Sequence, residues 1–253
     1  MNSALPLGPL ERVRIVLCRP SHPGNIGAAA RAMKTMGLSH LVLVAPKQFP
    51  DAEAEARASG AIDVLSRATV CTTLAEALTG TVLVAGMSAR RRDLAAPFRW
   101  AREAAAELLA GIRQGRQTND VALVFGTESA GLSNVELALC HFPVMIPANS
   151  EYSSLNLGAA VQLMCYELRL AATVPGIAPR SDADLATAEE IEGFHEHLER
   201  VAVASGFLDP TQPKRLMHRM RRLFGRVRLE HDEVSILRGL LTTVEKAKIR
   251  RKS

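Results

Sequence analysis

Five short apolar runs recur along the first part of the chain, and they constrain its fold more than any other feature. They are Val13–Cys18, Leu41–Ala45, Thr81–Ala85, Val121–Phe125 and Phe142–Ile146. Runs of this length are typical of strands that are buried on both faces. Because segments with helical periodicity separate them, the sequence predicts an α/β domain with a parallel sheet.

The pattern changes after residue 172. The segment Thr173–Ser181 holds two prolines and a glycine and indicates a linker. Beyond it only helical patterns follow, at Leu185–Ser205, Pro213–Val227 and Val234–Arg250. We therefore expect a sheet domain at residues 1–172, a linker at 173–184 and a small all-α domain at 185–253.

Charge is segregated in the predicted helical domain. The chain carries a formal net charge of +5 and has a pI of about 9.3. Residues 210–229 hold seven Lys and Arg and no acid, whereas residues 180–209 hold eight acids and two arginines. A basic stripe of this kind indicates binding to a phosphate polymer. The alternative is a solvated helix face that is balanced by its acidic neighbour.

Several functional classes lack their sequence signatures. The chain has no dinucleotide-binding GxGxxG, no P-loop GxxxxGK[ST] and no hydrolase GxSxG. Its four cysteines form no CxxC pair, which indicates buried thiols in a reducing cytosol and no metal site. No signal peptide and no apolar run of about 20 residues is visible. We therefore expect a cytoplasmic protein without a membrane partner.

Four of the apolar runs lead into polar loops, at residues 19–27, 86–92, 126–133 and 146–157. Ligands of an open parallel sheet bind outside the carboxyl ends of its strands, so these loops can converge on one site. The last loop, rich in Ser and Asn, indicates a seat for a polar ligand at a strand-to-helix junction. An ordinary loop with a Ser or Asn helix cap is the alternative.

The first loop is expected to be non-helical, because residues 19–27 hold two prolines and two glycines. Asn25 is then placed to cap the following helix, Ile26–Met36, which Gly37 ends.

Three of these loops carry motifs that resemble those of the SPOUT RNA methyltransferases. The motifs are HPGNIGAAAR (His22 to Arg31), LVFGTESAGL (Leu123 to Leu132) and IPANSEYSSLNLGAAVQ (Ile146 to Gln162). The resemblance covers about residues 13–172. RAMKTMGL (Arg31 to Leu38) and MHRMRRLFGRVRLE (Met217 to Glu230) are most similar to the members that 2′-O-methylate cytidine or uridine ribose in tRNA.

The resemblance implies a parallel α/β domain with a C-terminal trefoil knot, an obligate homodimer and S-adenosyl-L-methionine as cofactor. Periodicity predicts no knot, since knots are very rare among folds. By similarity, the cofactor contacts fall on Met87, Ser88, Ala89, Gly126, Ile146, Ser153, Ser154 and Leu155. Small residues there would let backbone groups approach the cofactor closely.

The resemblance also implies a catalytic set of Asn25, Arg31, Glu128, Ser154 and Asn156. The family assigns Arg31 to activation of the ribose hydroxyl, yet a guanidinium stays protonated in proteins. We therefore expect Arg31 to clamp a phosphate and to stabilise the developing alkoxide; proton transfer through a phosphate oxygen is the second option. The alternatives are a surface arginine at Arg31 and a helix-start carboxylate at Glu128.

The implied partner is tRNA, and the implied target is the pyrimidine at anticodon-loop position 32. We expect RNA contacts from Arg90, Arg91, Arg92, Arg215, Arg219 and Arg222. Another tRNA or rRNA ribose is the alternative substrate. A non-catalytic RNA-binding protein with a degenerate pocket is the alternative from another class, and the intact catalytic set speaks against it.

Overall fold

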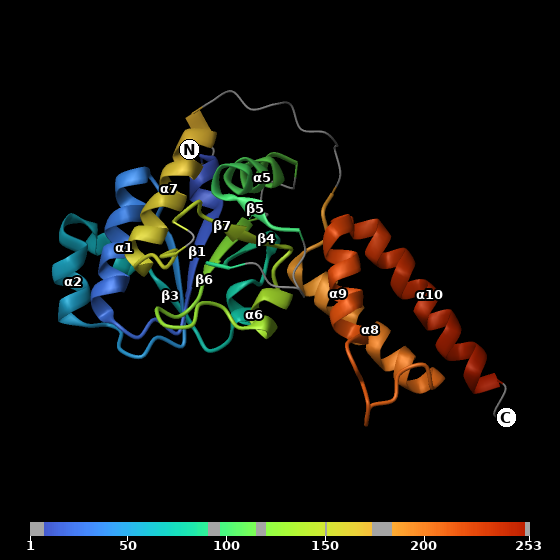
Figure 1. The fold of residues 1–253 in the computed structure, drawn as a ribbon. Helices are drawn as coiled ribbons and strands as arrows, with labels where there is room; N and C mark the ends of the chain where they lie inside the picture. The colour runs from blue at the N-terminus through green and yellow to red at the C-terminus, as the bar shows by residue number, and fades with distance from the viewer. Residues whose placement is uncertain (1–7, 91–96, 115–119, 150, 174–183, 251–253) are drawn as a thin grey trace.

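The computed structural model describes residues 8–90, 97–114, 120–149, 151–173 and 184–250. Its centre is a seven-stranded sheet of order β3-β2-β1-β6-β4-β7-β5, in which every neighbouring pair is parallel (Figure 1). The strands are β1 Val13–Cys18, β2 His40–Val44, β3 Thr69–Cys71, β4 Thr81–Met87, β5 Arg99–Trp100, β6 Asp120–Phe125 and β7 Phe142–Met145. The predicted parallel α/β sheet is thereby confirmed.

Helices cover both faces of this sheet. They are α1 Pro23–Met36, α2 Ala52–Ala58, α3 Ile62–Ser66, α4 Leu74–Ala77, α5 Ala101–Gln114, α6 Asn134–Ala138 and α7 Leu157–Thr173, with 3-10 helices η1 Pro9–Arg12 and η2 Ser59–Ala61. Ile15 and Leu17 of β1 point into the core under α1, α5 and α7. Val16 and Cys18 point into a second core with residues of α4 and α6. The runs are apolar throughout because both faces are covered, and each buried aliphatic side chain contributes about 1.5–3 kcal/mol.

Helix α1 begins earlier than the sequence indicated. It starts at Pro23, follows His22 in extended conformation and ends at Gly37, whose φ is 82°. The prediction that residues 19–27 exclude a helix was wrong, and so was the prediction that Asn25 caps it. Proline is well suited to the first helical position, since that position needs no N–H partner and has a φ near −65°. Asn25 therefore lies in the first turn of α1.

Helix α5 begins later than its predicted start at Arg99. Arg99 and Trp100 instead form β5, which pairs with Val144 and Met145 of β7. The Trp100 N–H donates to the Glu103 carboxylate at 3.1 Å, which satisfies a donor at the start of the helix. Pairing at the sheet edge thus overrides a local helical pattern.

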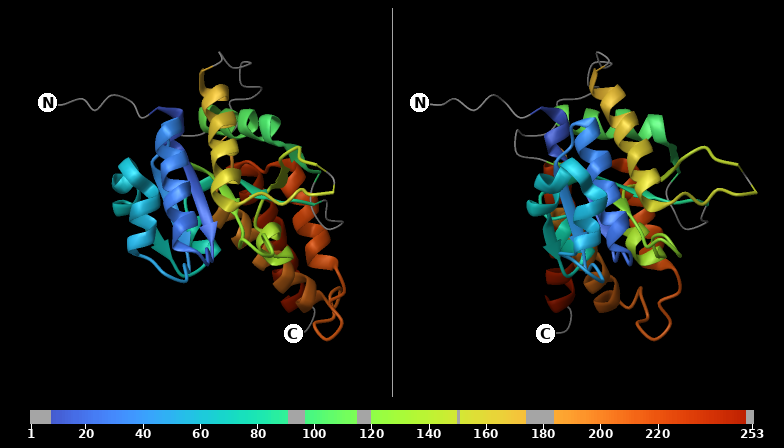
Figure 2. Two further views of the ribbon diagram at one scale, coloured as in Figure 1. Left: turned by 60° about the vertical axis from the view of Figure 1, so that its left-hand side comes forward. Right: turned by 90° about the vertical axis from the view of Figure 1, so that its left-hand side faces the viewer.

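Close packing joins α1, α2 and α7 into one layer. A Cβ on Gly27 would lie 2.1 Å from the Ala54 carbonyl oxygen, and one on Gly158 would lie 2.8 Å from Ala28 Cβ. Both glycines therefore allow a helix approach that any side chain would block. Figure 2 shows α1 and α7 side by side in both views. This packing places the amino ends of α1 and α7 close together.

The helices after residue 184 are α8 Ala188–Ser205, α9 Leu216–Val227 and α10 His231–Arg250. They share a small core of their own, formed by Ala186, Phe194, Leu229 and Val234. Contacts to the rest of the chain include the N–H of Gly80, just before β4, which donates to Glu189 at 2.8 Å, and an ion pair between Arg228 and Glu107 of α5. Within the part of the chain that the structure describes, none of the helices has the length and hydropathy of a membrane span.

The apolar side chains of α9 are covered only in part. Phe224 packs edge-on against Phe194, with ring centroids 4.7 Å apart. Leu223 and Val227 stay 44% and 57% exposed, and no residue of α9 is fully buried.

Candidate active site

The four polar loops come from four adjacent strands. In the sheet order β1-β6-β4-β7, each strand ends in one of the loops singled out from the sequence. All strands run in the same direction, so the loops meet at one edge, as predicted. The crossovers therefore bring together segments that lie more than a hundred residues apart in the chain.

A cavity of about 490 Å³ lies at this edge. All eight residues predicted to contact a cofactor line it: Met87, Ser88, Ala89, Gly126, Ile146, Ser153, Ser154 and Leu155. The Ser88 N–H donates to the Val144 carbonyl at 2.9 Å, and the Ser153 hydroxyl donates to the Ala89 carbonyl at 3.5 Å. Those contacts connect the loop after β4 to the loop after β7.

The loop after β6 folds back on itself as the cavity wall. Thr127 and Gly131 exchange backbone hydrogen bonds of 2.9 and 3.3 Å. A Cβ on Gly126 would lie 2.0 Å from the Gly131 carbonyl carbon, so only glycine fits there. Gly126 is thus required for closure of the loop itself, whereas the sequence suggested only that its size helps a ligand approach.

Glu128 is held by donors from the first loop. Its carboxylate accepts hydrogen bonds from the Ser21 N–H and hydroxyl, from the His22 N–H and from Asn25 Nδ2, at 2.8–3.2 Å. Burial acts to raise the pKa of Glu128, but the bonds from Asn25 and Ser21 outweigh it and lower that pKa to about 2. At neutral pH the side chain is therefore an anion whose hydrogen-bonding capacity is largely used.

Asn25 and Asn156 extend this arrangement toward α7. Asn156 Nδ2 donates to Asn25 Oδ1 at 3.0 Å, and the Gly158 N–H donates to Asn156 Oδ1 at 2.9 Å. Glu128, Asn25 and Asn156 thus form one hydrogen-bonded chain across all three motifs. Asn156, rather than Asn25, accepts a hydrogen bond from the start of the next helix, which is the capping role expected of the last loop.

The other two predicted catalytic residues, Ser154 and Arg31, lie apart from this series of hydrogen bonds. Ser154 is exposed and lines the cavity of the predicted cofactor contacts. Arg31 is exposed on α1, six residues beyond Asn25, which is about 9 Å along a helix axis. Within the described residues the Arg31 guanidinium has no hydrogen bond or ion pair. Arg31 lines neither this cavity nor a second one beside it, which Asn25 and Asn156 line. The structure of one chain therefore does not bring Arg31 to the other four.

The backbone N–H groups of Ser21 and His22 are part of the candidate site, which the sequence did not indicate. Both present backbone N–H groups to Glu128 because the chain turns sharply before Pro23. A main-chain contact of this kind cannot be predicted from residue type, because every residue except proline has a backbone N–H. The only available signal was the pair of prolines that frames Ser21 and His22.

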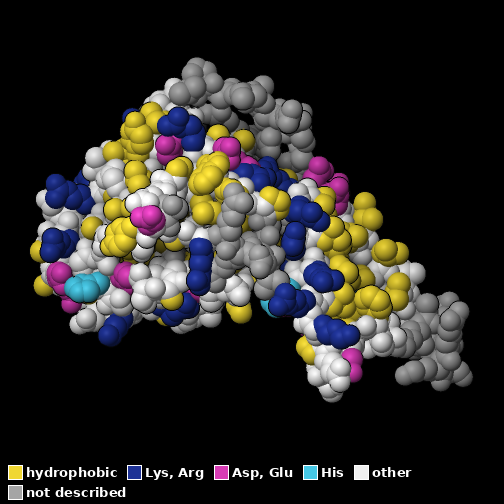
Figure 3. All heavy atoms as spheres, in the orientation of Figure 1, with side chains coloured by type: hydrophobic (Ala, Val, Ile, Leu, Met, Phe, Trp, Pro, Cys, Tyr) yellow, Lys and Arg dark blue, Asp and Glu magenta, His cyan; other side chains and the backbone are white. Residues whose placement is uncertain are grey.

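The predicted RNA-contacting arginines fall into three groups. Arg90 is exposed and lines the cavity, while Arg91 and Arg92 lie outside the described residues. Arg215, Arg219 and Arg222, which belong to α9 or lie beside it, are exposed, and Figure 3 shows Lys and Arg side chains gathered over this part of the molecule. Two further members of the basic stripe are neutralised internally, since Arg221 pairs with Glu192 and Arg228 with Glu107. The stripe is therefore partly a balanced face and partly an exposed basic surface.

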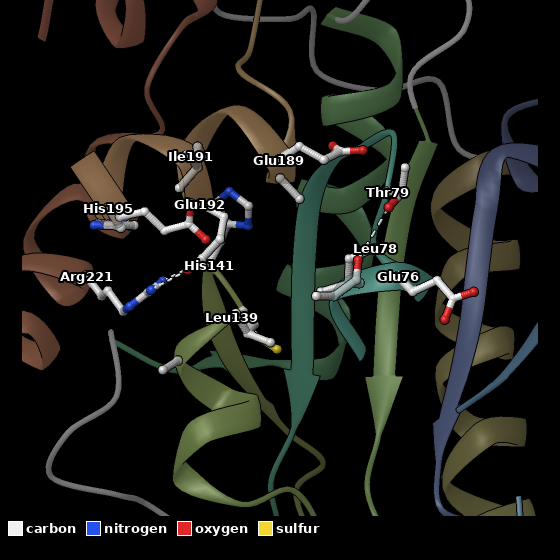
Figure 4. Close-up of a pocket in the computed structure, with 17 residues that line it drawn as sticks. Glu76, Leu78, Thr79, Leu139, His141, Glu189, Ile191, Glu192, His195 and Arg221 are labelled. Atoms are coloured by element: carbon white, nitrogen blue, oxygen red, sulfur yellow. Dashed lines mark hydrogen bonds and ion pairs between the residues drawn. The ribbon is translucent and has the colours of Figure 1, made fainter. Parts of the chain in front are cut away.

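A separate cavity of about 410 Å³ lies between the segments that precede β4 and β7 and the helical part (Figure 4). His141 and His195 line it, together with the Arg221–Glu192 ion pair. The Val84 N–H donates to His141 Nδ1 at 3.1 Å, which requires that nitrogen to be unprotonated. Burial, together with Arg228, lowers the pKa of His141 to about 4, and burial with Arg221 does the same for His195. Both histidines are neutral at pH 7.

Comparison with protein families divides the chain in two. The profile of the SpoU rRNA methylase family matches residues 12–166. The profile of the tRNA methyltransferase TrmJ C-terminal domain matches residues 189–253. The first match contains all three motifs and every predicted cofactor contact, and the second contains α9 and its arginines.

Relatives of known name match almost the whole chain. It is 49% identical over 247 residues to tRNA (cytidine/uridine/adenosine-2′-O-)-methyltransferase TrmJ of Pseudomonas aeruginosa strain UCBPP-PA14, covering 94% of this chain and 95% of the relative. It is 47% identical over 245 residues to tRNA (cytidine/uridine-2′-O-)-methyltransferase TrmJ of Yersinia pestis strain Pestoides F, covering 94% and 93%. The crystal structure of TrmJ from Z. mobilis ZM4 is similar at a TM-score of 0.79 and 35% identity, covering 92% and 98%.

Proposed function

This chain belongs to the SpoU rRNA methylase family, and on that premise we propose that it methylates a ribose 2′-hydroxyl of tRNA with S-adenosyl-L-methionine as methyl donor. The observation that carries the proposal is the cavity at the carboxyl ends of β4, β6 and β7, which lies beside the Glu128–Asn25–Asn156 chain. Polar groups of three motifs thus meet at a site large enough for a cofactor.

The residues of the cavity fit S-adenosyl-L-methionine. The apolar side chains of Met87, Ile146 and Leu155 can pack against the adenine ring. The hydroxyls of Ser88 and Ser153 can form hydrogen bonds with polar groups of the cofactor. The cavity volume of about 490 Å³ lies within the usual range for small-molecule sites. When bound, the cofactor supplies a methyl group that its sulfonium has already activated. The protein must then align the ribose hydroxyl and assist loss of its proton.

Glu128 acts by holding the loop, not by accepting a proton. With a pKa of about 2 it stays ionised at neutral pH, and Ser21, His22 and Asn25 occupy its oxygens. A group with so low a pKa is a weak base at pH 7. Its function in the proposal is to fix Asn25, which in turn fixes Asn156 beside the reacting hydroxyl. Ser154 faces that hydroxyl from the cofactor side.

Arg31 supplies the positive charge of the proposed site. A guanidinium remains charged in proteins, so its role is to clamp a substrate phosphate and to stabilise the developing alkoxide. Because its side chain is exposed and free of ion pairs within the described residues, it is available to RNA.

The proposal includes a homodimer. Leu163 and Tyr166 of α7 are 41% and 46% exposed and lie three residues apart on one helix face, and Trp100 of β5 is 39% exposed. Large apolar side chains gathered on a helix face favour burial against another protein surface. The trefoil knot implied by the resemblance also belongs to the proposal and stays a prediction.

The helical part is proposed as the tRNA-binding domain. We place its boundaries at residues 185–253, after a linker at 173–184 and a methyltransferase domain at 1–172. Exposed Arg215, Arg219 and Arg222 support contact with the phosphate backbone. The proposed target is the nucleotide at anticodon-loop position 32, and the alternative is another ribose of tRNA or rRNA. The proposed location of the protein is the cytoplasm.

Calorimetry with S-adenosyl-L-methionine tests the cofactor site. The wild-type protein should bind it, and Gly126→Ala should abolish binding, because the added Cβ collides with the backbone of Gly131 and deforms the cavity wall. Gly60→Ala is the matched control, since a Cβ there meets no atom within 4 Å. Equal binding by wild type and Gly126→Ala would exclude this cavity as the cofactor site.

A further inference from the structure

A neighbouring cavity of about 370 Å³ lies beside the proposed active site. It is bounded by the first turns of α1, by α2 and by the loop before α7. Its lining consists of His22, Gly24, Asn25, Ala28, Glu53, Arg57 and Asn156. The volume is within the range of small-molecule sites.

Glycines on α1 bring α2 to this cavity. A Cβ on Gly24 would lie 2.7 Å from Glu53 Oε1, and one on Gly27 would lie 2.8 Å from Arg57 Cβ. With these glycines, α2 lies directly against the first turns of α1. Glu53 and Arg57 are therefore held next to Asn25, although α2 lies outside the three motifs.

The two cavities share one segment of chain as their common wall. Ser153, Ser154 and Leu155 line the cofactor cavity, whereas Asn156 lines the neighbouring one. Asn25 lines the neighbouring cavity as well and donates to Glu128, which lines the first. A nucleotide whose ribose lies at this segment can thus extend its base into the neighbouring cavity.

The polar groups of the cavity suit a neutral heterocycle better than a phosphate. The Glu53 carboxylate supplies acceptors, and Arg57 supplies donors one turn further along α2. His22 Nδ1 lies 3.9 Å from Glu53 Oε2, and within the described residues the Arg57 guanidinium has no ion pair. A carboxylate repels phosphate, while a donor and an acceptor side by side match the edge of a base.

We propose that this cavity binds the base of the nucleotide that is methylated, with Glu53 accepting a hydrogen bond from the exocyclic amine of cytosine. Arg57 donates to the ring acceptor of the same base. This inference rests on the proposed function and names the part of the chain that reads the substrate. Uracil has a carbonyl where cytosine has the amine, so Glu53 favours cytidine over uridine at the target position.

The test uses two tRNA transcripts that differ only in having cytidine or uridine at the target position. Single-turnover methylation by the wild-type protein should be faster on the cytidine transcript. Glu53→Gln should lower the single-turnover rate on cytidine roughly tenfold or more, because the charge that strengthens the bond from the amine is lost. The rate on uridine should change little, because an amide can also donate to the uracil carbonyl. Glu55→Gln, an exposed acid on α2 that does not line the cavity, is the control and should keep the wild-type ratio.

The outcomes separate this inference from the proposed function. An unchanged cytidine-to-uridine ratio in Glu53→Gln, or an equal loss on both transcripts, overturns base recognition by Glu53 while methylation itself stands. Absence of methylation on both transcripts with wild-type protein overturns the proposed function and this inference together. Glu53→Asp, which keeps the charge, should retain the preference for cytidine and excludes a mere folding defect.

Discussion

Replacement of Glu128 by Gln distinguishes a loop-holding carboxylate from one that transfers a proton. The amide keeps the size of the side chain but turns one acceptor oxygen into a donor, so at least one hydrogen bond from Ser21, His22 or Asn25 must break. A hydrogen bond to a charged group contributes about 1.5–3 kcal/mol. Because Glu128 is partly exposed, we expect a discounted loss of about 1–2 kcal/mol in the free energy of unfolding at neutral pH.

The pH dependence of this loss follows from the direction of the pKa shift. The pKa of Glu128 is about 2 in the folded protein and ordinarily 4.5, so the folded state favours the anion. The stabilisation is therefore fully present above about pH 4.5 and is lost as the pH falls toward about 2. Urea unfolding should show a difference between wild type and Glu128→Gln that is constant near neutral pH and shrinks in this acidic window.

The catalytic part of the prediction uses single-turnover methyl transfer with saturating tRNA. Between roughly pH 5 and pH 9, Glu128→Gln should lower the rate by the same factor at every pH, since Glu128 does not titrate there. Glu55→Gln on α2 should leave the rate unchanged. A wild-type rate that rises with an apparent pKa near 6 or 7, and loses that rise in Glu128→Gln, would refute the loop-holding role.

Three further predictions concern charge. Arg31→Ala and Arg31→Lys should both lower the single-turnover rate at saturating tRNA, the lysine less, and wild-type rates in both would exclude a catalytic role. Lowering the pH from about 6.5 to about 4 should reduce the free energy of unfolding by on the order of 1 kcal/mol per pH unit for each of His141 and His195, because the unfolded state gains the protons first. Urea titrations in which the wild type loses no more stability over this range than His141→Gln would contradict this. Charge reversal at Arg215, Arg219 and Arg222 should weaken tRNA binding and flatten the dependence of the affinity on salt concentration. An unchanged salt dependence would mean that these arginines form only a solvated face.

The sheet could be predicted because its determinants are local. Each buried strand is a continuous apolar run, and each is bounded by Gly, Pro or polar residues, so the type of each element and its place along the chain follow from the sequence. The order β1-β6-β4-β7 did not follow, since strand neighbours depend on crossovers between distant segments. The start of α1 was missed because proline was taken as a breaker, although at Pro23 it occupies the one helical position that favours it.

The sequence indicated which residues line the cavity, but not the hydrogen bonds that connect the loops. Residue motifs located the cavity, since all eight predicted cofactor contacts line it. They did not reveal that Glu128 accepts from the Ser21 and His22 backbone, because main-chain donors are the same at every residue. The sequence did not indicate Glu53 for another reason. Glu53 reaches the site only because α1 and α2 pack closely at Gly24, and this contact depends on the tertiary structure.

Mass spectrometry of tRNA treated with the purified protein and S-adenosyl-L-methionine tests the central claim most directly. Nuclease fragments should show one added methyl group on the ribose of a single nucleotide, which we expect at anticodon-loop position 32. The same treatment with Gly126→Ala, whose cofactor cavity is deformed, should leave the tRNA unmodified. Methylation on a base instead of a ribose, or none in any tRNA or rRNA with cofactor bound, would contradict the account.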